Sequence, residues 1–483
     1  MMAAAMAMEP AAPTTKKRKL AAVDIHELTP ATLATEAPDL QPPTTAEESQ
    51  EPPRGAEEDG GESLLDRISN LCDAVLGEII TLLPTKEGAR TQILSSRWRH
   101  LWHTAPLNLD YLEADVGVVL SAHQGSCRRI CLPLPRHRWQ ADDTDAWLRS
   151  PALDNLQELE FDLSPCFPYP PPTPPPATFR FSSTLRVATF SQCHLPYRTV
   201  KTLRFAQLKK LAFLEVEILE RSMHSIVALG CPVLESLMLN NCRYVGHLRI
   251  NSPTLISIGF RYSLSKLTIE DAPSLQRLVQ FEKYTKMQVT IISAPKLETL
   301  GYISEWFGKS KIVFGSTVIQ ELRIDSLAAV VCTVKILAIN LYTFDLDMVV
   351  DLMRFFPCLE KFYVKMAQPA EKRFRPSKHR NLFSSLDTRL KTLVLGCYRS
   401  TQPQVKLATF VVSNARMLES VRLEVDLQNY KEVFFAEQHR RLGMEKRASR
   451  DARLCFAANC PHDASTVVHL SDLDLTDPFA CAC

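Results

Sequence analysis

The stretch Leu234–Cys242, LESLMLNNC, carries the spacing that decides the fold of this chain. Its leucines follow the pattern L-x-x-L-x-L, and the L-x-L end has the two-residue period of a strand with one buried face. One short strand of this kind cannot bury its apolar face alone. The stretch therefore predicts that similar units stack beside it.

Similar units recur on both sides of Leu234. Further copies of the pattern begin at Leu156, Leu185, Leu208, Leu255, Leu275, Leu297, Ile319, Leu359, Leu390 and Leu418. Most starts lie roughly 20–31 residues apart, which is the period of leucine-rich repeats. Five copies have a proline two residues before their first leucine: Pro232, Pro253, Pro273, Pro295 and Pro357. A proline at this place fixes the conformation of the chain that leads into the strand. We predict an α/β fold in which residues 108–365 form an irregular leucine-rich-repeat solenoid, with a parallel sheet on its concave face.

Three segments depart from this pattern. Residues 164–176 contain eight prolines and predict an exposed, extended insertion, with a proline-recognition segment as the alternative. Residues 366–389 are basic and polar and predict a loop, after which the pattern resumes over residues 390–453. Residues 454–483 have no strong periodicity and predict a flexible tail.

Residues 1–62 predict a disordered segment, because they are rich in Ala, Pro, Thr and Glu and poor in aromatic residues. A basic run within them is either a nuclear import signal or a solvated charge cluster. The run consists of Lys16, Lys17, Arg18 and Lys19. No secretory signal pattern opens the sequence, and its 14 cysteines are irregularly spaced, as free thiols in a reducing compartment are. We expect the protein in the nucleus, the cytoplasm or both.

Residues 63–107 predict a small unit of three helices. The candidate N-caps are Asp73, Thr85 and either Ser95 or Ser96. Gly88 is unfavourable inside the second helix, by about 1 kcal/mol relative to Ala. Trp98 and Trp102 share one face of the third helix; they pack on the following domain, or one ring points inward and the other lies at an interface. About forty residues make a small core, so we expect part of the apolar surface to face a partner.

The order and spacing of these residues resemble the F-box of plant F-box proteins. The resemblance rests on DRISNL at Asp66–Leu71, Val75, Leu76, Ile79, LLPTK at Leu82–Lys86 and LSSRWRHLW at Leu94–Trp102. Cys72 stands where the family usually has Pro, and Gly88 where it has a larger helix former. The resemblance implies that the segment binds a Skp-type adaptor and, through it, a cullin scaffold. The implied adaptor face comprises Leu71, Val75, Ile79, Leu83, Leu94, Trp98, Leu101 and Trp102.

A second resemblance concerns residues 390–453. LKTLVLGCY at Leu390–Tyr398 and FVVSNARMLESV at Phe410–Val421 look like the FBD module that follows the repeats in many plant F-box proteins. The segment predicts a strand, an amphipathic helix and a strand. Such a module would cap the open end of the solenoid.

The sequence argues against catalysis and against several ligands. It has no glycine-rich phosphate loop, no H-E-x-x-H and no G-x-S-x-G. The net charge of +2 gives no field that favours nucleic acid, and the longest apolar stretch, 327–339, is too short to span a membrane. The residues best suited to zinc are spaced too closely, so a tail without metal is favoured. They are Cys455, Cys460, His462, His469, Cys481 and Cys483.

Three functions remain. The leading prediction is a non-catalytic substrate receptor of a Skp–cullin–F-box ubiquitin ligase, with the repeats holding an unidentified target protein. The alternative is a repeat scaffold that binds a partner without promoting its degradation. The third is a metal-dependent enzyme or a zinc-stabilised tail. We expect no cofactor, no nucleic-acid partner and no membrane partner.

Overall fold

The computed structural model describes most of the chain between residues 68 and 480. The described residues are 68–110, 116–133, 141–162, 170–280, 287–304, 310–324, 329–342, 344–366, 388–458 and 470–480. The predicted disordered segment and the basic run Lys16–Lys19 lie outside them, as does nearly all of the predicted basic loop.

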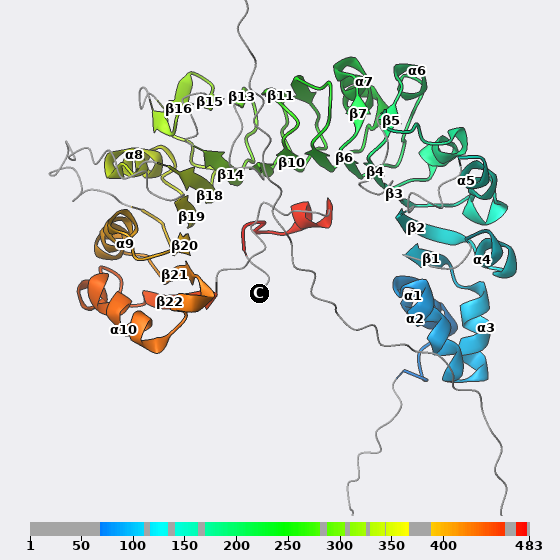
Figure 1. Cartoon of the computed structure of the whole chain (residues 1–483), viewed down its shortest axis with the longest axis horizontal. Helices are drawn as coiled ribbons and strands as arrows, with labels where there is room; N and C mark the ends of the chain where they lie inside the picture. Colours follow the sequence, from blue (N-terminus) through cyan, green and yellow to red (C-terminus); the bar gives the residue numbers. More distant parts are fainter. Residues whose placement is uncertain are drawn as a thin grey trace, which may run out of the picture. The chain divides into compact units, whose positions relative to one another are not determined.

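A parallel sheet of 14 strands runs through the described residues (Figure 1). In sheet order its strands are β1 (Leu107–Asp110), β2 (Cys127–Pro133), β3 (Glu158–Asp162), β4 (Val187–Ser191), β6 (Lys210–Leu214), β8 (Ser236–Asn240), β10 (Ser257–Arg261), β12 (Arg277–Gln280), β14 (Thr299–Ser304), β18 (Ile336–Leu341), β19 (Lys361–Met366), β20 (Thr392–Tyr398), β21 (Ser420–Val425) and β22 (Arg453–Ala458). In the middle of the sheet the pairing is regular: Leu237 lies opposite Leu211 of β6 and Ile258 of β10. The register shifts between β1 and β2, between β14 and β18, and between β20 and β21. The predicted α/β class and the stacked parallel strands are therefore confirmed.

The connections behind the strands vary along the chain. Three helices open the described residues: α1 (Asp73–Leu82), α2 (Thr85–Arg90) and α3 (Ser96–Thr104), with the 3-10 turn η1 (Thr91–Ile93) before α3. Helical connections elsewhere are α4 (Val116–Ala122), α5 (Ala141–Leu148), η2 (Pro151–Leu153), η3 (Pro176–Ser183), α6 (Tyr197–Val200), α7 (Glu220–Ser225), η4 (Ile226–Gly230), α8 (Leu346–Phe355), α9 (Gln402–Asn414), η7 (Leu427–Asn429), α10 (Glu432–Arg441) and η8 (Met444–Lys446). The short strands β5 (His194–Leu195) and β7 (Glu217–Ile218) pair with each other.

Between β8 and β18, strands replace the helices. A second sheet contains β9 (His247–Asn251), β11 (Lys266–Asp271), β13 (Gln288–Ile291), β15 (Lys311–Phe314), β16 (Thr317–Gln320) and β17 (Arg323–Ile324). The sequences of β9, β11 and β13, such as KLTIED in β11, alternate apolar and polar residues, and the burial alternates with them. Period-two alternation is the sequence sign of a half-buried strand, so these connectors carry that signal as well.

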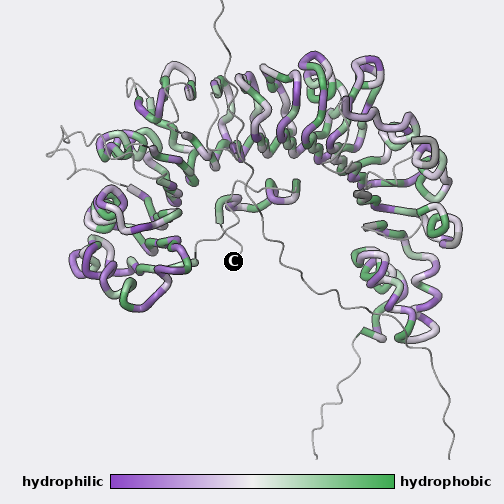
Figure 2. Tube along the Cα trace, viewed as in Figure 1, coloured by the Kyte–Doolittle hydropathy of each residue, from purple (hydrophilic) through white to green (hydrophobic). Residues whose placement is uncertain are grey.

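The two faces of the large sheet serve different cores. Leu237 and Leu239 of β8 belong to the main hydrophobic core, which also contains helix residues such as Val349 of α8. Met238, between them, points the other way because successive side chains alternate along a strand. We call this side the second face; its buried apolar residues are Ala212, Met238, Val279, Tyr302, Ala338, Tyr363 and Val394. Hydrophobic residues recur along the strands in Figure 2, and hydrophilic ones gather on the connecting turns.

The structure corrects one predicted repeat. The copy that begins at Ile319 does not enter the large sheet: β16 pairs antiparallel with β15 in the second sheet. The place beside β14 and β19 is taken by β18. Its repeat, VKILAI from Val334, has a β-branched residue where the pattern has leucine, and Cys332 where other copies have proline. The other copies each supply one strand of the large sheet.

Two predictions about irregular segments are also wrong where the structure describes them. Within the proline-rich insertion, residues 170–176 are not a free excursion: Pro174 and Pro175 are buried, and the carbonyl of Pro172 accepts a hydrogen bond from the amide of His194 at 2.9 Å. Within the predicted flexible tail, Arg453–Ala458 form β22, and residues 470–480 pack on the second face. In both segments the contacts are with residues outside the segment, so its own sequence pattern does not record them.

Candidate functional site

The first candidate site is the helical unit formed by α1, α2 and α3. Ser95 caps α3 as expected, its hydroxyl accepting from the amide of Trp98 at 3.5 Å. The N-cap of α1 is Cys72, not Asp73, which lies in the first turn; that of α2 is Pro84, not Thr85. Neither N-cap forms a side-chain hydrogen bond, so other contacts must hold the starts of these helices.

Arg97, which the sequence patterns do not single out, supplies such a contact at the start of α1. Its Nε lies 2.7 Å from Oδ1 of Asp73, and its Nη1 donates to the carbonyl of Ser69 at 2.7 Å. Nη2 also donates to the carbonyl of Leu71. A guanidinium with several fixed donors can bind carbonyls and a carboxylate together. This contact joins α3 to the segment before α1 and offsets the missing cap at Cys72.

Helix α1 has two apolar faces. Leu76 and Ile80 are buried in the main core. Val75, Ile79 and Leu82, at spacings of four and three residues, form a second stripe that is exposed. This exposed stripe is a surface that the described chain does not cover. Helical spacing alone did not reveal which of the two stripes would be buried.

The remaining predicted adaptor-face residues divide into two groups. Leu94 is exposed, and Leu71 and Leu83 are partly buried. Trp98, Leu101 and Trp102 lie in the main core, and the two tryptophans are only 6% and 8% exposed. The alternative in which one ring lies at an interface is therefore wrong, because both rings are buried; the ring of Trp102 packs on Gly88 of α2 and on His123. Three exposed residues that the prediction missed are Ile68, Leu82 and Ile93.

Gly88 provides the space that the ring of Trp102 occupies. A Cβ atom at this position would lie 2.5 Å from Cζ3 of Trp102, closer than packed atoms can approach. The ring is fixed on its other side by an edge contact with His123, at 5.2 Å between centroids. The sequence predicts that Gly88 weakens its helix; the structure shows what the missing side chain allows.

We expect Gly88→Ala to destabilise the protein by about 1 kcal/mol. The gain of about 1 kcal/mol in helix propensity is outweighed by an overpacking cost of about 1–3 kcal/mol. Gly77→Ala in α1 is the matched control, since nothing lies within 4 Å of a Cβ there, and we expect it to stabilise. Urea denaturation followed by far-UV circular dichroism measures both variants. Equal stabilisation by the two would contradict the packing described.

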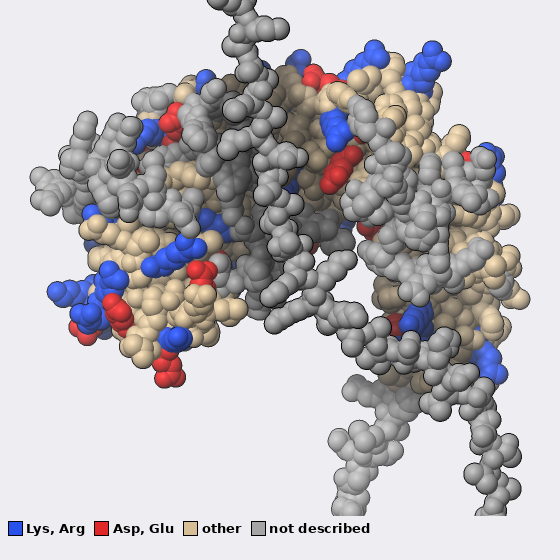
Figure 3. Space-filling view, viewed as in Figure 1, with Lys and Arg blue, Asp and Glu red and all other residues tan. Residues whose placement is uncertain are grey.

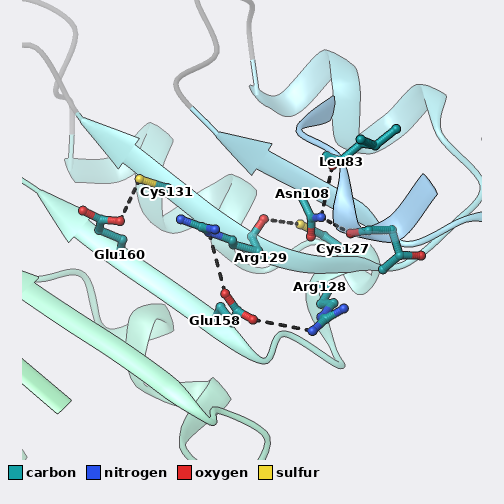
Figure 4. A network of polar contacts seen from close by, with 9 residues as sticks. Leu83, Asn108, Cys127, Arg128, Arg129, Cys131, Glu158 and Glu160 are labelled. Carbon is teal, nitrogen blue, oxygen red and sulfur yellow. Dashed lines mark hydrogen bonds and ion pairs between the residues drawn. The ribbon is translucent and has the colours of Figure 1, made fainter. Parts of the chain in front are cut away.

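The helical unit is tied to the first strands of the sheet. The side-chain amide of Asn108, on β1, donates to the carbonyls of Leu83 at 3.2 Å and of Thr81 (Figure 4). The hydroxyl of Thr85 donates to the carbonyl of Asn108. Nε2 of His123 lies 2.9 Å from the carbonyl oxygen of Trp102. The three helices therefore pack on the repeats as one body.

Cysteines near this junction form hydrogen bonds. The thiol of Cys127 donates to the carbonyl of Arg129 at 3.2 Å, and that of Cys131 to Oε2 of Glu160 at 2.9 Å (Figure 4). Further along, burial raises the pKa of both Cys231 and Cys242 to about 12, so their thiols stay protonated at neutral pH. Within the part of the chain that the structure describes, no group of three or more His, Cys, Asp or Glu side chains is placed to hold a metal ion.

Most of the predicted zinc candidates lie outside the described residues. Cys455 is exposed on β22, whereas the other candidates lie outside the described residues: Cys460, His462, His469, Cys481 and Cys483. Among the described helices, none has the length and apolar character needed to cross a bilayer. On the face shown in Figure 3, basic and acidic side chains are interspersed rather than gathered into one patch.

The second candidate site is the second face of the large sheet. The segment Leu470–Ala480 packs on it and begins with the 3-10 helix η10 (Leu470–Asp474), drawn in red in Figure 1. Leu470, Leu473 and Phe479 of this segment are buried together with the apolar residues of the second face. Polar contacts reach the segment from strands between β6 and β19. The repeats thus present a surface that accepts a short peptide segment in a 3-10 helix and turn conformation.

Comparisons with known proteins agree with this architecture. The family model described as FBD-associated F-box protein At5g56370, LRR repeats, matches residues 144–364. The FBD family model matches residues 378–423, so it begins and ends earlier than the predicted module at 390–453. The helical unit at 63–107 precedes both matches.

Individual relatives are similar proteins of Arabidopsis thaliana. Putative F-box/LRR-repeat protein At3g28410 is 23% identical over 292 residues, which are 55% of this chain and 62% of that protein. Putative F-box/LRR-repeat protein At5g02930 is 25% identical over 232 residues, 46% of this chain and 48% of that protein. The chain thus spans less than two thirds of either. F-box/FBD/LRR-repeat protein At1g51370 is 24% identical over 406 residues, 74% of this chain and 89% of that protein. Together with the strand array, these matches support an F-box/LRR-repeat protein with a C-terminal FBD module.

Proposed function

We propose that this chain is a non-catalytic substrate receptor of a Skp–cullin–F-box ubiquitin ligase. The unit α1–α3 binds a Skp-type adaptor, which in turn binds a cullin scaffold, and the repeats bind a target protein. The chain itself makes or breaks no covalent bond. It acts by raising the effective concentration of the target near the enzyme that carries ubiquitin.

The observation that carries this proposal is the exposed apolar stripe Val75, Ile79 and Leu82 on a helix whose other face is already buried. Ile93 and Leu94, at the turn before α3, are exposed as well. Several large apolar side chains exposed on so small a unit favour a binding surface, since they cost free energy in water unless a partner covers them. The proposed adaptor surface therefore consists of these five residues, with Leu71 and Leu83 at its margin. Trp98, Leu101 and Trp102 support it from beneath.

We expect Leu82→Asp to weaken binding of a purified Skp-type adaptor at least about tenfold, because it places a charge in an apolar interface. Leu82 is 73% exposed, so the substitution leaves the fold in place. Isothermal titration calorimetry on the full chain measures the effect. Ile93→Asp provides a second, independent test on the 3-10 turn.

The matched control is Leu427→Asp, because Leu427 is 75% exposed but lies in η7, far along the chain. It should bind the adaptor as the unmodified chain does. Unchanged adaptor affinity in both Leu82→Asp and Ile93→Asp would refute the proposed surface. Absence of adaptor binding by the unmodified chain would refute the proposed function.

A further inference from the structure

The segment Leu470–Ala480, LSDLDLTDPFA, is held on the second face by three kinds of contact. Side-chain contacts and hydrogen bonds from side chains of the sheet hold it there, and it adds no strand to the described sheet order. Contacts of this kind recognise particular side chains of a peptide.

The first contact is an acidic anchor. Oδ2 of Asp477 accepts from the hydroxyl of Tyr363 at 2.8 Å and from Nζ of Lys361 at 2.8 Å, both on β19. Asp477 is buried, yet its charge is paired and hydrogen-bonded, as a buried carboxylate requires. Burial and the neighbouring carboxylate raise the pKa of Tyr363, so its hydroxyl keeps the proton that it donates. Lys361 and Tyr363 thus form a site for a negatively charged hydrogen-bond acceptor.

The second contact is an aromatic anchor two residues later. The ring of Phe479 meets that of Tyr302 edge-on, with centroids 5.0 Å apart, and lies 5.6 Å from the ring of Tyr363. Edge contacts of this kind are favoured by the aromatic quadrupole. Oδ1 of Asp477 accepts from the amide of Phe479 at 3.3 Å, which fixes the turn between the two anchors. Tyr363 therefore contacts both anchor residues.

The third contact holds the leucine end. Leu473 is fully buried, and its carbonyl accepts from Nε of Arg277 at 2.9 Å and from the hydroxyl of Ser257 at 3.2 Å. Asp474 pairs with Lys210 of β6. Basic residues of β6, β12 and β19 thus meet an acidic segment, and the charges are complementary.

We propose that the second face is a recognition surface for an acidic linear peptide of the form L-x-x-x-D-x-F, and that Leu470–Ala480 occupies it as an intramolecular competitor. The target that the repeats receive would present the same side chains in the same order. That such a peptide belongs to a ligase target rests on the proposed function, whereas binding of the peptide to the second face does not.

Competition follows from the covalent link. A segment tethered to its own site acts at an effective concentration of about millimolar, so a free peptide must overcome it. A peptide of similar intrinsic affinity is therefore bound about tenfold or more weakly while the segment is docked. Release of the segment switches the receptor to a state that binds its target.

The test uses a fluorescein-labelled peptide with the sequence of residues 470–480 and the full chain. The release variant carries Asp477→Ala and Phe479→Ala; by fluorescence anisotropy we expect it to bind the peptide at least about tenfold more tightly than the unmodified chain. Adding Tyr363→Phe to the release variant should lower its affinity for the peptide about tenfold, since a hydrogen bond to a charged group is lost. Adding Tyr430→Phe, in a half-exposed loop, should change nothing. A peptide with alanines replacing the anchor Asp and Phe is the specificity control.

Equal peptide affinity for the unmodified chain and the release variant, or no binding by either, would overturn the proposal. If the release variant does not fold, full-length Asp477→Asn replaces it, because that change keeps the size of the side chain. Adaptor binding, measured in parallel, separates the two claims: its loss in every variant would contradict the proposed function, while tighter peptide binding would still support recognition by the second face.

Discussion

Trp102→Ala should lower the free energy of unfolding by about 3–5 kcal/mol, the usual cost of removing a large aromatic side chain from a core. The Trp102 ring packs on Gly88 and His123 and is buried in the main core. The loss would be measured by urea denaturation with far-UV circular dichroism. Adaptor binding should fall too, because the helices that carry the exposed stripe lose their support.

Leu82→Ala is the control that separates core from surface. It removes an apolar side chain from the same unit, yet stability should change by no more than about 0.5 kcal/mol because Leu82 is exposed. Adaptor affinity should nevertheless drop. A Trp102→Ala protein as stable as the unmodified chain would show that the ring is not packed as described.

Leu337→Ala should cost about 2–5 kcal/mol, since Leu337 of β18 is fully buried in the main core and its removal leaves a cavity. Strand β18 joins β14 to β19, so weakening it also weakens the contact between the two halves of the sheet. Urea denaturation monitors stability, and limited proteolysis monitors local opening around residues 329–342.

The matched control is Val330→Ala, a half-exposed apolar residue in the segment just before β18. We expect it to leave both readouts nearly unchanged. Should Leu337→Ala prove as mild as Val330→Ala, β18 would not be an internal strand of the sheet. The comparison therefore tests the strand that the repeat pattern missed.

The repeat strands could be predicted because their signal is local. A leucine at each buried position and a proline before it mark one strand at a time, and stacking follows from the need to bury one face. The copy at Val334 lacks a first leucine and a preceding proline, but so does the copy at Ile319, so the pattern does not separate β18 from the segment that pairs in the second sheet. The β-branched residue still fills the buried position, which shows that the core requires apolar volume rather than leucine itself.

The candidate sites could be predicted only in part, because exposure depends on neighbours distant in sequence. Trp98 and Trp102 share one face of α3, but both rings are buried in the main core. Leu82 lies beyond the buried stripe and is left open. Similarly, Asp477 and Phe479 meet partners more than a hundred residues away, and no periodicity in their own segment records this.

The junction between the helices and the sheet has a mechanical consequence. Ala105 and Pro106 alone separate α3 from β1, and Asn108 ties that strand back to the end of α1. No compliant linker of the Gly/Ser type lies between them to absorb rotation. A protein that binds at α1 is therefore held in a fixed orientation relative to the repeats. If the chain acts in a ubiquitin ligase, the position at which the repeats bind the target would determine which target lysines can reach the ubiquitin-carrying enzyme. Flexibility between the helices and the repeats would contribute little.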